Sequence, residues 1–115
     1  MQTDTSTTLL TLTSADLDRL PWRDISGCPG VRAKELWHAG GSVDALINYT
    51  PGATTPGHPH PNADHHIWVT EGQAWIAGER LPTGSYVYVP PGTAHPIEAD
   101  RYTGCVLLQI HRPRS

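Results

Sequence analysis

The sequence has few positively charged residues. It contains 8 lysines and arginines against 11 aspartates and glutamates, which gives a formal charge of −3 at pH 7. Because nucleic acids and anionic membranes attract clustered positive charge, this balance argues against either of them as a partner. No apolar run approaches the ~18 residues needed to cross a bilayer, and no signal-peptide segment opens the chain. We therefore expect a cytoplasmic protein.

Cysteine is also scarce. Cys28 and Cys105 are the two cysteines, and they lie far apart in the sequence without a Cys-x-x-Cys motif. We expect two unpaired thiols rather than a disulfide. Cys105 lies in an apolar strand pattern and is expected in the core.

Glycine and proline, in contrast, are plentiful. The chain has 115 residues, enough for one domain, and eleven glycines and eleven prolines divide it into short segments. About eight of these segments have strand patterns, and no long helix or internal repeat is evident. The clearest are 31–38, 43–49, 65–70, 73–77, 86–89 and 105–110. This pattern predicts an all-β fold, a sandwich or barrel, over residues 25–115.

The two ends of the chain are expected to lie outside this fold. Residues 1–24 are predicted to form an N-terminal arm, whose threonine-rich residues 1–12 are either disordered or added to a neighbour's sheet. Ser14 is expected to cap a short helical turn that Pro21 ends. Residues 111–114 are predicted to form a solvated basic tail, which would leave His111 without a ligand role.

Five of the seven histidines gather in two stretches, 52–72 and 84–95, and are His58, His60, His65, His66 and His95. Neutral imidazole is the commonest protein ligand for divalent transition metals. On an extended chain residues i and i+2 share a face, so His58 and His60 are able to aim at one point. This clustering predicts a metal site.

Only one of the neighbours His65 and His66 is able to face that point from a strand. Ile67 shares the face of His65, whereas Trp68 shares the face of His66. Since both are apolar, alternation alone does not choose between the two histidines.

The two stretches resemble the two motifs of the cupin superfamily, and the resemblance covers about residues 30 to 111. The first motif is a glycine, His-x-His, a glutamate and a glycine, matched here by Gly52, His58-Pro59-His60, His65 and Gly72. The second is a glycine, Pro-x-Gly, a histidine and an asparagine, matched by Gly84, Pro90-Pro91-Gly92, His95 and Ala99. His65 thus replaces the usual glutamate, and Ala99 the usual asparagine. The resemblance implies a small cupin-type β-barrel, also described as a double-stranded β-helix or jelly roll.

The resemblance also implies that His58, His60, His65 and His95 bind one divalent metal. Asp64, which fits a shorter motif spacing, and His66 are alternatives to His65 as the fourth ligand. Four neutral imidazoles leave the full 2+ charge on the site. Such a set suits Fe(II) or Zn first, with Ni, Cu and Co also possible, and disfavours Mg and Ca.

The function implied is that of a metalloenzyme acting on a small carbonyl or enol-type substrate. Cupins with all-histidine iron sites include dioxygenases that cleave diketones, and small cupins include cyclases of aromatic polyketides. Asp64, Tyr49 and Tyr88 are the candidate catalytic residues for proton transfer. Further candidate pocket residues are Tyr86, Trp68 and Trp75.

Two non-catalytic functions are the alternatives. The chain also resembles the cupin domain attached to certain anti-sigma factors, which implies a metal-binding or small-molecule-sensing module. The lack of a fused zinc-binding helical domain argues against direct regulation, and a storage or scaffold role is less favoured still. In either case we expect a homodimer, because small cupins commonly exchange edge strands, with the N-terminal arm and Trp22 or Trp37 near the contact.

Overall fold

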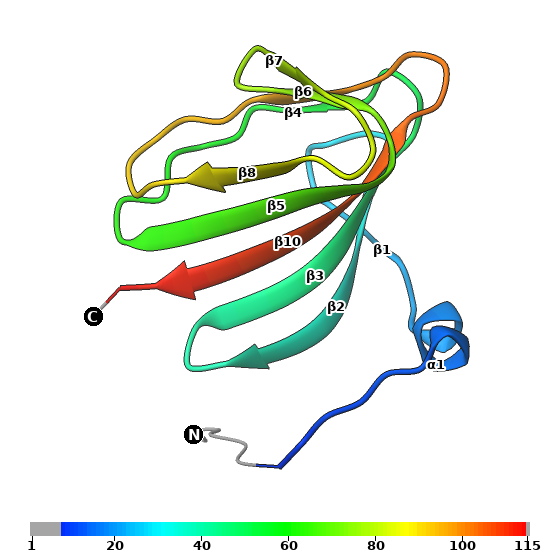
Figure 1. Cartoon of the computed structure of the whole chain (residues 1–115), viewed down its shortest axis with the longest axis vertical. Coiled ribbons are helices and arrows are strands. Elements are labelled where there is room, and N and C mark those ends of the chain that lie inside the picture. The colour runs from blue at the N-terminus through cyan, green and yellow to red at the C-terminus, as the bar shows by residue number, and fades with distance from the viewer. Residues whose placement is uncertain (1–7, 115) are drawn as a thin grey trace.

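The computed structural model describes residues 8–114, which form one short helix and two antiparallel sheets (Figure 1). The six-stranded sheet has the order β1-β2-β3-β10-β5-β8, and the four-stranded sheet the order β4-β9-β6-β7. The elements are α1 (Ser14–Arg19), β1 (Arg23–Asp24), β2 (Val31–Ala39), β3 (Ser42–Tyr49), β4 (Thr54–Thr55), β5 (Ala63–Gly72), β6 (Ala74–Ile76), β7 (Glu79–Leu81), β8 (Tyr86–Val89), β9 (Ile97–Ala99) and β10 (Cys105–Pro113).

The core lies between the two sheets, because strands of both alternate buried and exposed residues. On β5 and β10 the inward residues Ile67 and Leu107 are fully buried, and they belong to the same core cluster as Ile76 on β6. Burying one such side chain contributes about 1.5–3 kcal/mol. Two facing antiparallel sheets confirm the all-β prediction and are consistent with a jelly roll, although the sheets remain separate over residues 8–114.

Strand β10 occupies the middle of the larger sheet, between β3 and β5. It pairs with both neighbours and continues to Pro113. The predicted solvated tail at 111–114 is therefore wrong. Cross-strand partners hold this segment, because Arg112 Nη1 donates to Asp44 Oδ1 at 2.8 Å and Arg114 Nη2 donates to Asp64 Oδ1 at 2.8 Å.

Helix α1 begins at Ser14, so its N-cap lies one residue before the predicted cap. Thr13, rather than Ser14, is the N-cap, and it exchanges hydrogen bonds with Asp16 in a capping box. The helix ends at Arg19, two residues before Pro21, as expected. Lys34 Nζ on β2 donates to the Leu17 carbonyl at 2.6 Å and so ties the helix to the sheet.

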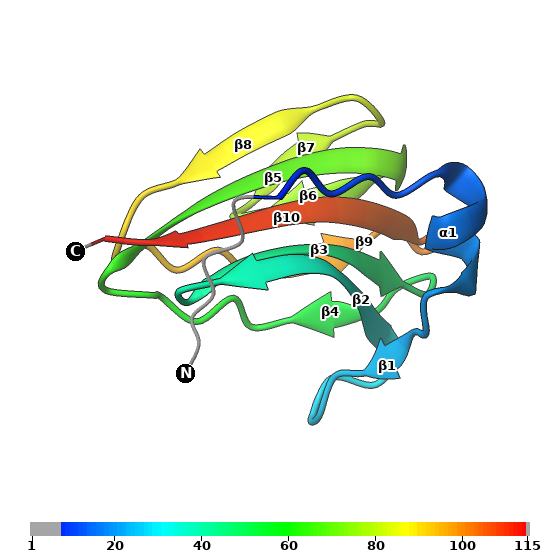
Figure 2. The same cartoon turned by 90° about the horizontal axis from the view of Figure 1, so that it is seen from below.

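The arm before α1 runs across the outer face of the larger sheet and stands away from it (Figures 1 and 2). Leu9 is 86% exposed and Leu10 53%. Predictions for residues 1–7 lie outside the described residues. Over residues 8–114, no helix has the length and apolar character needed to span a membrane.

Candidate metal centre

Strand β5 turns His65 into the molecule and His66 out of it. The residues Ala63, His65 and Ile67 alternate as buried positions, and His65 is 3% exposed. The His66 ring lies on the opposite face, where its Nδ1 is 2.6 Å from the hydroxyl of Tyr86. The structure thus answers the question that alternation left open, because His65 is the neighbour that points inward.

Strand β10 places His111 beside His65. The two residues are register partners on adjacent strands, and His65 Nε2 lies 2.5 Å from His111 Nδ1. The ring centroid of His60 lies 4.4 Å from that of His65 and 5.6 Å from that of His111. One ring nitrogen from each of the three lies within 4.8 Å of the others, so the three histidines could hold a metal ion.

His95, which lies between β8 and β9, is the next histidine beside this cluster. It is 4% exposed, and its ring centroid lies 5.3 Å from that of His65 and 6.1 Å from that of His60. Its Nδ1 lies 3.2 Å from the Thr93 carbonyl, a contact that favours a proton on Nδ1 and leaves Nε2 with a lone pair. His58 is exposed and lines the same cavity as His60 and His95.

Burial keeps the inner histidines, His65, His95 and His111, neutral. It lowers the pKa of His65 to about 4, with smaller effects from the neighbouring His60 and His111. Burial also lowers the pKa of His95 and that of His111. Since a metal binds the unprotonated nitrogen, these histidines offer lone pairs at neutral pH.

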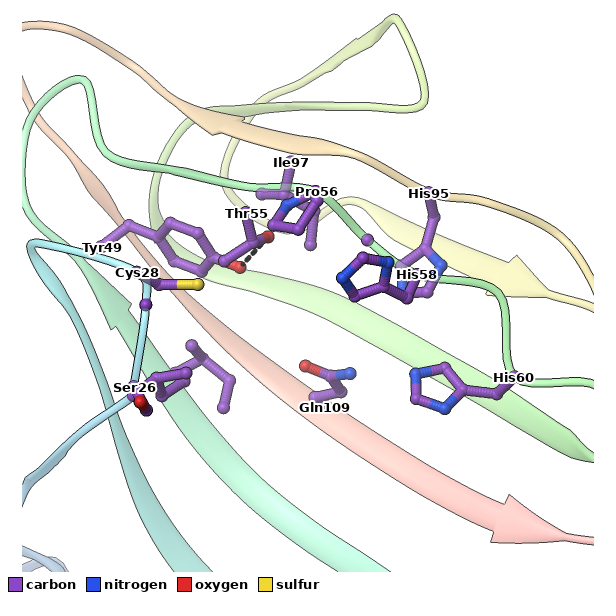
Figure 3. Close-up of a pocket in the computed structure, with 14 residues that line it drawn as sticks. Ser26, Cys28, Tyr49, Thr55, Pro56, His58, His60, His95, Ile97 and Gln109 are labelled. Carbon is purple, nitrogen blue, oxygen red and sulfur yellow. Dashed lines mark hydrogen bonds between the residues drawn. The ribbon is translucent and has the colours of Figure 1, made fainter.

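The cluster borders a cavity of about 450 Å³ between the sheets (Figure 3). Figure 3 shows His58, His60 and His95 on one side, and Tyr49, Thr55 and Cys28 on the other. Tyr49 is 3% exposed, its hydroxyl lies 2.9 Å from Thr55 Oγ1, and burial raises its pKa to about 12. Tyr49 is therefore a protonated hydroxyl at the end of the cavity remote from the histidines.

The other two candidate catalytic residues lie on the outer face of the sheet. Tyr88 donates to Asp64 Oδ1 at 2.5 Å, and Arg114 Nε and Nη2 donate to the same carboxylate at 2.9 and 2.8 Å. The hydrogen bonds from Arg114 lower the pKa of Asp64 to about 2. Asp64 and Tyr88 form an ion-pair network with Arg114 and do not line the cavity, whereas Tyr49 does.

The further pocket candidates divide in the same way. Tyr86 and Trp68 pack against each other on the outer face, with ring centroids 4.7 Å apart, and each is at least 37% exposed. Trp75 is also 37% exposed, and the guanidinium of Arg80 lies 6.0 Å from its ring centroid. None of the three lines the cavity.

Sequence reasoning missed two residues of this site, His111 and Gln109. The side-chain amide of Gln109 lies 3.5 Å from His65 Nδ1 and lines the cavity. Both residues share the inward face of β10 with Cys105 and Leu107, which the apolar pattern had already assigned to the core. Extending that alternation by four residues would have found them.

Known structures share this fold at low sequence identity. KdgF from Halomonas sp. matches with a TM-score of 0.75 and 24% identity, over 94% of this chain and 97% of that one. The polyketide cyclase RemF from Streptomyces resistomycificus matches with a TM-score of 0.73 and 18% identity, over 91% and 81%. At these identities the likeness shows the fold alone.

A third match is a chain in the crystal structure of Rhodobacter sphaeroides SigE in complex with the anti-sigma ChrR. Its TM-score is 0.70 at 24% identity, and the match covers 82% of this chain and 49% of that one. No curated protein matches the sequence. The profile of the family described as the ChrR Cupin-like domain matches residues 11–114, nearly the whole chain. The protein therefore belongs to the ChrR cupin-like domain family of the cupin superfamily.

Proposed function

We propose that this protein is a metal-dependent enzyme that acts on a small carbonyl or enol-type substrate. One observation carries the proposal: ring nitrogens of His60, His65 and His111 lie within 4.8 Å of one another, around a point where one metal ion could bind. That point lies beside a cavity large enough for a small molecule, which His58 and His95 also line. His58, His60, His65 and His95 are proposed as ligands, and the geometry adds His111 to them.

The donor set fits a divalent transition metal. Every candidate ligand is an imidazole, and burial holds the inner ones unprotonated, so we propose Fe(II) or Zn, with Ni, Cu and Co as further possibilities. A bound divalent ion would supply Lewis acidity toward an enolate or carbonyl oxygen, and iron would also supply redox chemistry with O₂.

The protein's own residues prepare the cavity for such a substrate. Gln109 lies beside His65 Nδ1 and is placed to orient that ring. Ile47 and Ile97 give the cavity apolar walls, which exclude water from the reacting group. The Tyr49 hydroxyl stays protonated and is placed to donate a hydrogen bond to the substrate.

Two chemistries fit this arrangement: dioxygenase-type cleavage of a diketone or hydroxyketone, and cyclase-type enolisation of a polyketide. The first needs iron and consumes O₂, whereas the second needs neither. The shared fold with RemF favours neither, because fold alone does not fix function.

The second candidate function is a non-catalytic metal- or small-molecule-sensing module. The specific observation behind it is the family match, since the family takes its description from ChrR, which a solved structure describes as an anti-sigma. A sensing module would bind metal and ligand without turnover. Under either function we propose a homodimer with a small molecule as its ligand.

The test is the metal content of untagged protein purified without oxygen, measured by elemental analysis. The wild type is expected to hold near-stoichiometric metal, and His65→Ala to lose it. The matched control is His66→Ala, which removes the neighbouring imidazole from the outer face and is expected to keep the metal. His111→Ala is expected to weaken metal binding by about 10-fold or more, at least as much as the loss of a residue that only orients a ligand.

A wild type without metal after reconstitution would refute the proposal. Equal metal loss in His65→Ala and His66→Ala would refute the ligand assignment. With metal bound, O₂ uptake on adding diketones and hydroxyketones distinguishes the two enzyme chemistries. Tight binding of such ligands with no product at all would favour the sensing module.

A further inference from the structure

The cavity beside the histidines carries no formal charge of its own. Among the described residues that line it, none is a lysine, arginine, aspartate or glutamate. A phosphate or a second carboxylate on a ligand would lose its hydration there without gaining a counter-ion, which is costly. A negative charge is therefore tolerated only on the atoms that would meet the metal.

The far end of the cavity offers one hydroxyl pair. Tyr49 from β3 and Thr55 from β4 share a hydrogen bond of 2.9 Å, which uses one of their two O–H hydrogens. The other O–H is left to donate, and the pair also keeps lone pairs that accept. Such a pair is suited to one neutral oxygen of a ligand, either a hydroxyl or a carbonyl.

The two ends face one another across the cavity. Figure 3 places the histidines on one side, the hydroxyl pair on the other, and Gln109 between them. The pair comes from strands of different sheets, so its position is fixed by the packing of the sheets. A ligand held at the histidine end therefore meets the hydroxyl pair at a defined site.

We infer that this cavity selects small, non-phosphorylated molecules with two adjacent oxygens at one end, an uncharged body and a single neutral oxygen at the other. This inference rests on the proposed metal centre, and it narrows the substrate class to polar but uncharged hydroxyketones, diketones or enediols. Sugar phosphates and dicarboxylates are excluded by the same argument.

Three hydroxypyrones that share one chelating end test the inference. At the ring position opposite the chelating pair, kojic acid carries a hydroxymethyl group, allomaltol a methyl group and comenic acid a carboxylate. Each is titrated into Co(II)-loaded protein, where the visible absorption of cobalt reports binding at the metal and calorimetry gives the dissociation constant. Kojic acid is expected to bind about 10-fold more tightly than allomaltol, the gain of one satisfied hydrogen bond, and comenic acid most weakly.

Variants locate the effect in the hydroxyl pair. Tyr49→Phe is expected to abolish the advantage of kojic acid over allomaltol while leaving allomaltol binding unchanged, and Thr55→Val to reduce the same advantage. The matched control, Tyr86→Phe, removes a hydroxyl from the outer face and is expected to change none of the three affinities.

The outcomes separate this inference from the metal proposal. Stoichiometric cobalt with equal binding of the three compounds, or with comenic acid binding best, would overturn the inference and leave the metal centre intact. An unchanged preference for kojic acid in both folded variants would also overturn it. Failure to take up cobalt would overturn the metal centre and the inference together.

Discussion

At the residue scale, the two cysteines occupy contrasting environments. Cys28 is half-buried and lines the cavity, whereas Cys105 is 3% exposed on β10. Burial raises the pKa of Cys105 to about 12, so its reactive thiolate is scarce below that pH. Both thiols are free in the structure.

We predict that iodoacetamide at pH 8 alkylates Cys28 in the native protein and leaves Cys105 unmodified until denaturant is added. Mass spectrometry of the digested protein measures both sites, and Cys28→Ser, which removes the fast-reacting thiol, is the control. Equal rates at the two cysteines in native protein would contradict the described burial of β10.

Single residues also show how far sequence reasoning reached. The clustered histidines were visible in the sequence, because motif spacing identifies His58, His60, His65 and His95 directly. The choice between His65 and His66 was not visible in the sequence, since it depends on which face of β5 packs against the second sheet. His111 was missed because its basic neighbours resemble a solvated tail, whereas Asp44 and Asp64 on adjacent strands pair with them.

At the element scale, strands with a clear pattern were predictable, including the four-residue β8, and the two-residue strands were not. Strand β3 was expected at 43–49 and is found at Ser42–Tyr49, because Val43, Ala45, Ile47 and Tyr49 give a clear alternation. Two-residue strands such as β4 contain too few residues to show a period. The positions of Asp64 and Tyr88 on the outer face depend on how the two sheets pack, which no local sequence signal shows.

The loop between β4 and β5 carries a glycine that positions the site. Gly57 has φ +63°. Its carbonyl accepts a 2.9 Å hydrogen bond from the backbone amide of His95. A Cβ at Gly57 would overlap the His95 carbonyl, which is backbone and has no rotamer to relieve the clash. Gly52 also has positive φ, +77°, but a Cβ there would meet nothing within 4 Å.

We therefore predict different effects for two alanine substitutions. Gly52→Ala adds only backbone strain of about 1 kcal/mol and leaves metal content unchanged. Gly57→Ala adds the same strain and also separates the loop of His58 from His95, which is expected to lower metal affinity about 10-fold or more. Thermal unfolding and metal titration measure the two effects, and equal metal affinity in both variants would show that the loop does not set the site.

At the scale of the whole molecule, apolar surface is left uncovered on one side. The outer face of the larger sheet has a shallow apolar depression around Trp68, Leu108 and Ile110. The arm that crosses this face carries Leu9, which is 86% exposed. A leucine and an apolar depression exposed on the same side favour their burial against a second copy of the chain.

We predict a homodimer in which the arm of each subunit covers the outer face of the other. Size-exclusion chromatography with light scattering at micromolar concentration should give about 25 kDa, twice the chain mass of 12.5 kDa. Leu9→Asp is expected to shift the population toward monomer, and Thr11→Asp, which adds the same charge two residues away, to do so much less. A wild-type monomer under these conditions would contradict the prediction.

The central position of β10 has a consequence for biosynthesis. This strand follows all the others in the chain, yet it lies between β3 and β5 in the finished sheet. Until it leaves the ribosome, β2–β3 and β5–β8 remain two separate pairs with open edges, and pairings this distant in sequence form slowly. His65 also lacks its neighbour His111 until then. The larger sheet, and with it the proposed metal centre, is thus completed only after translation of β10.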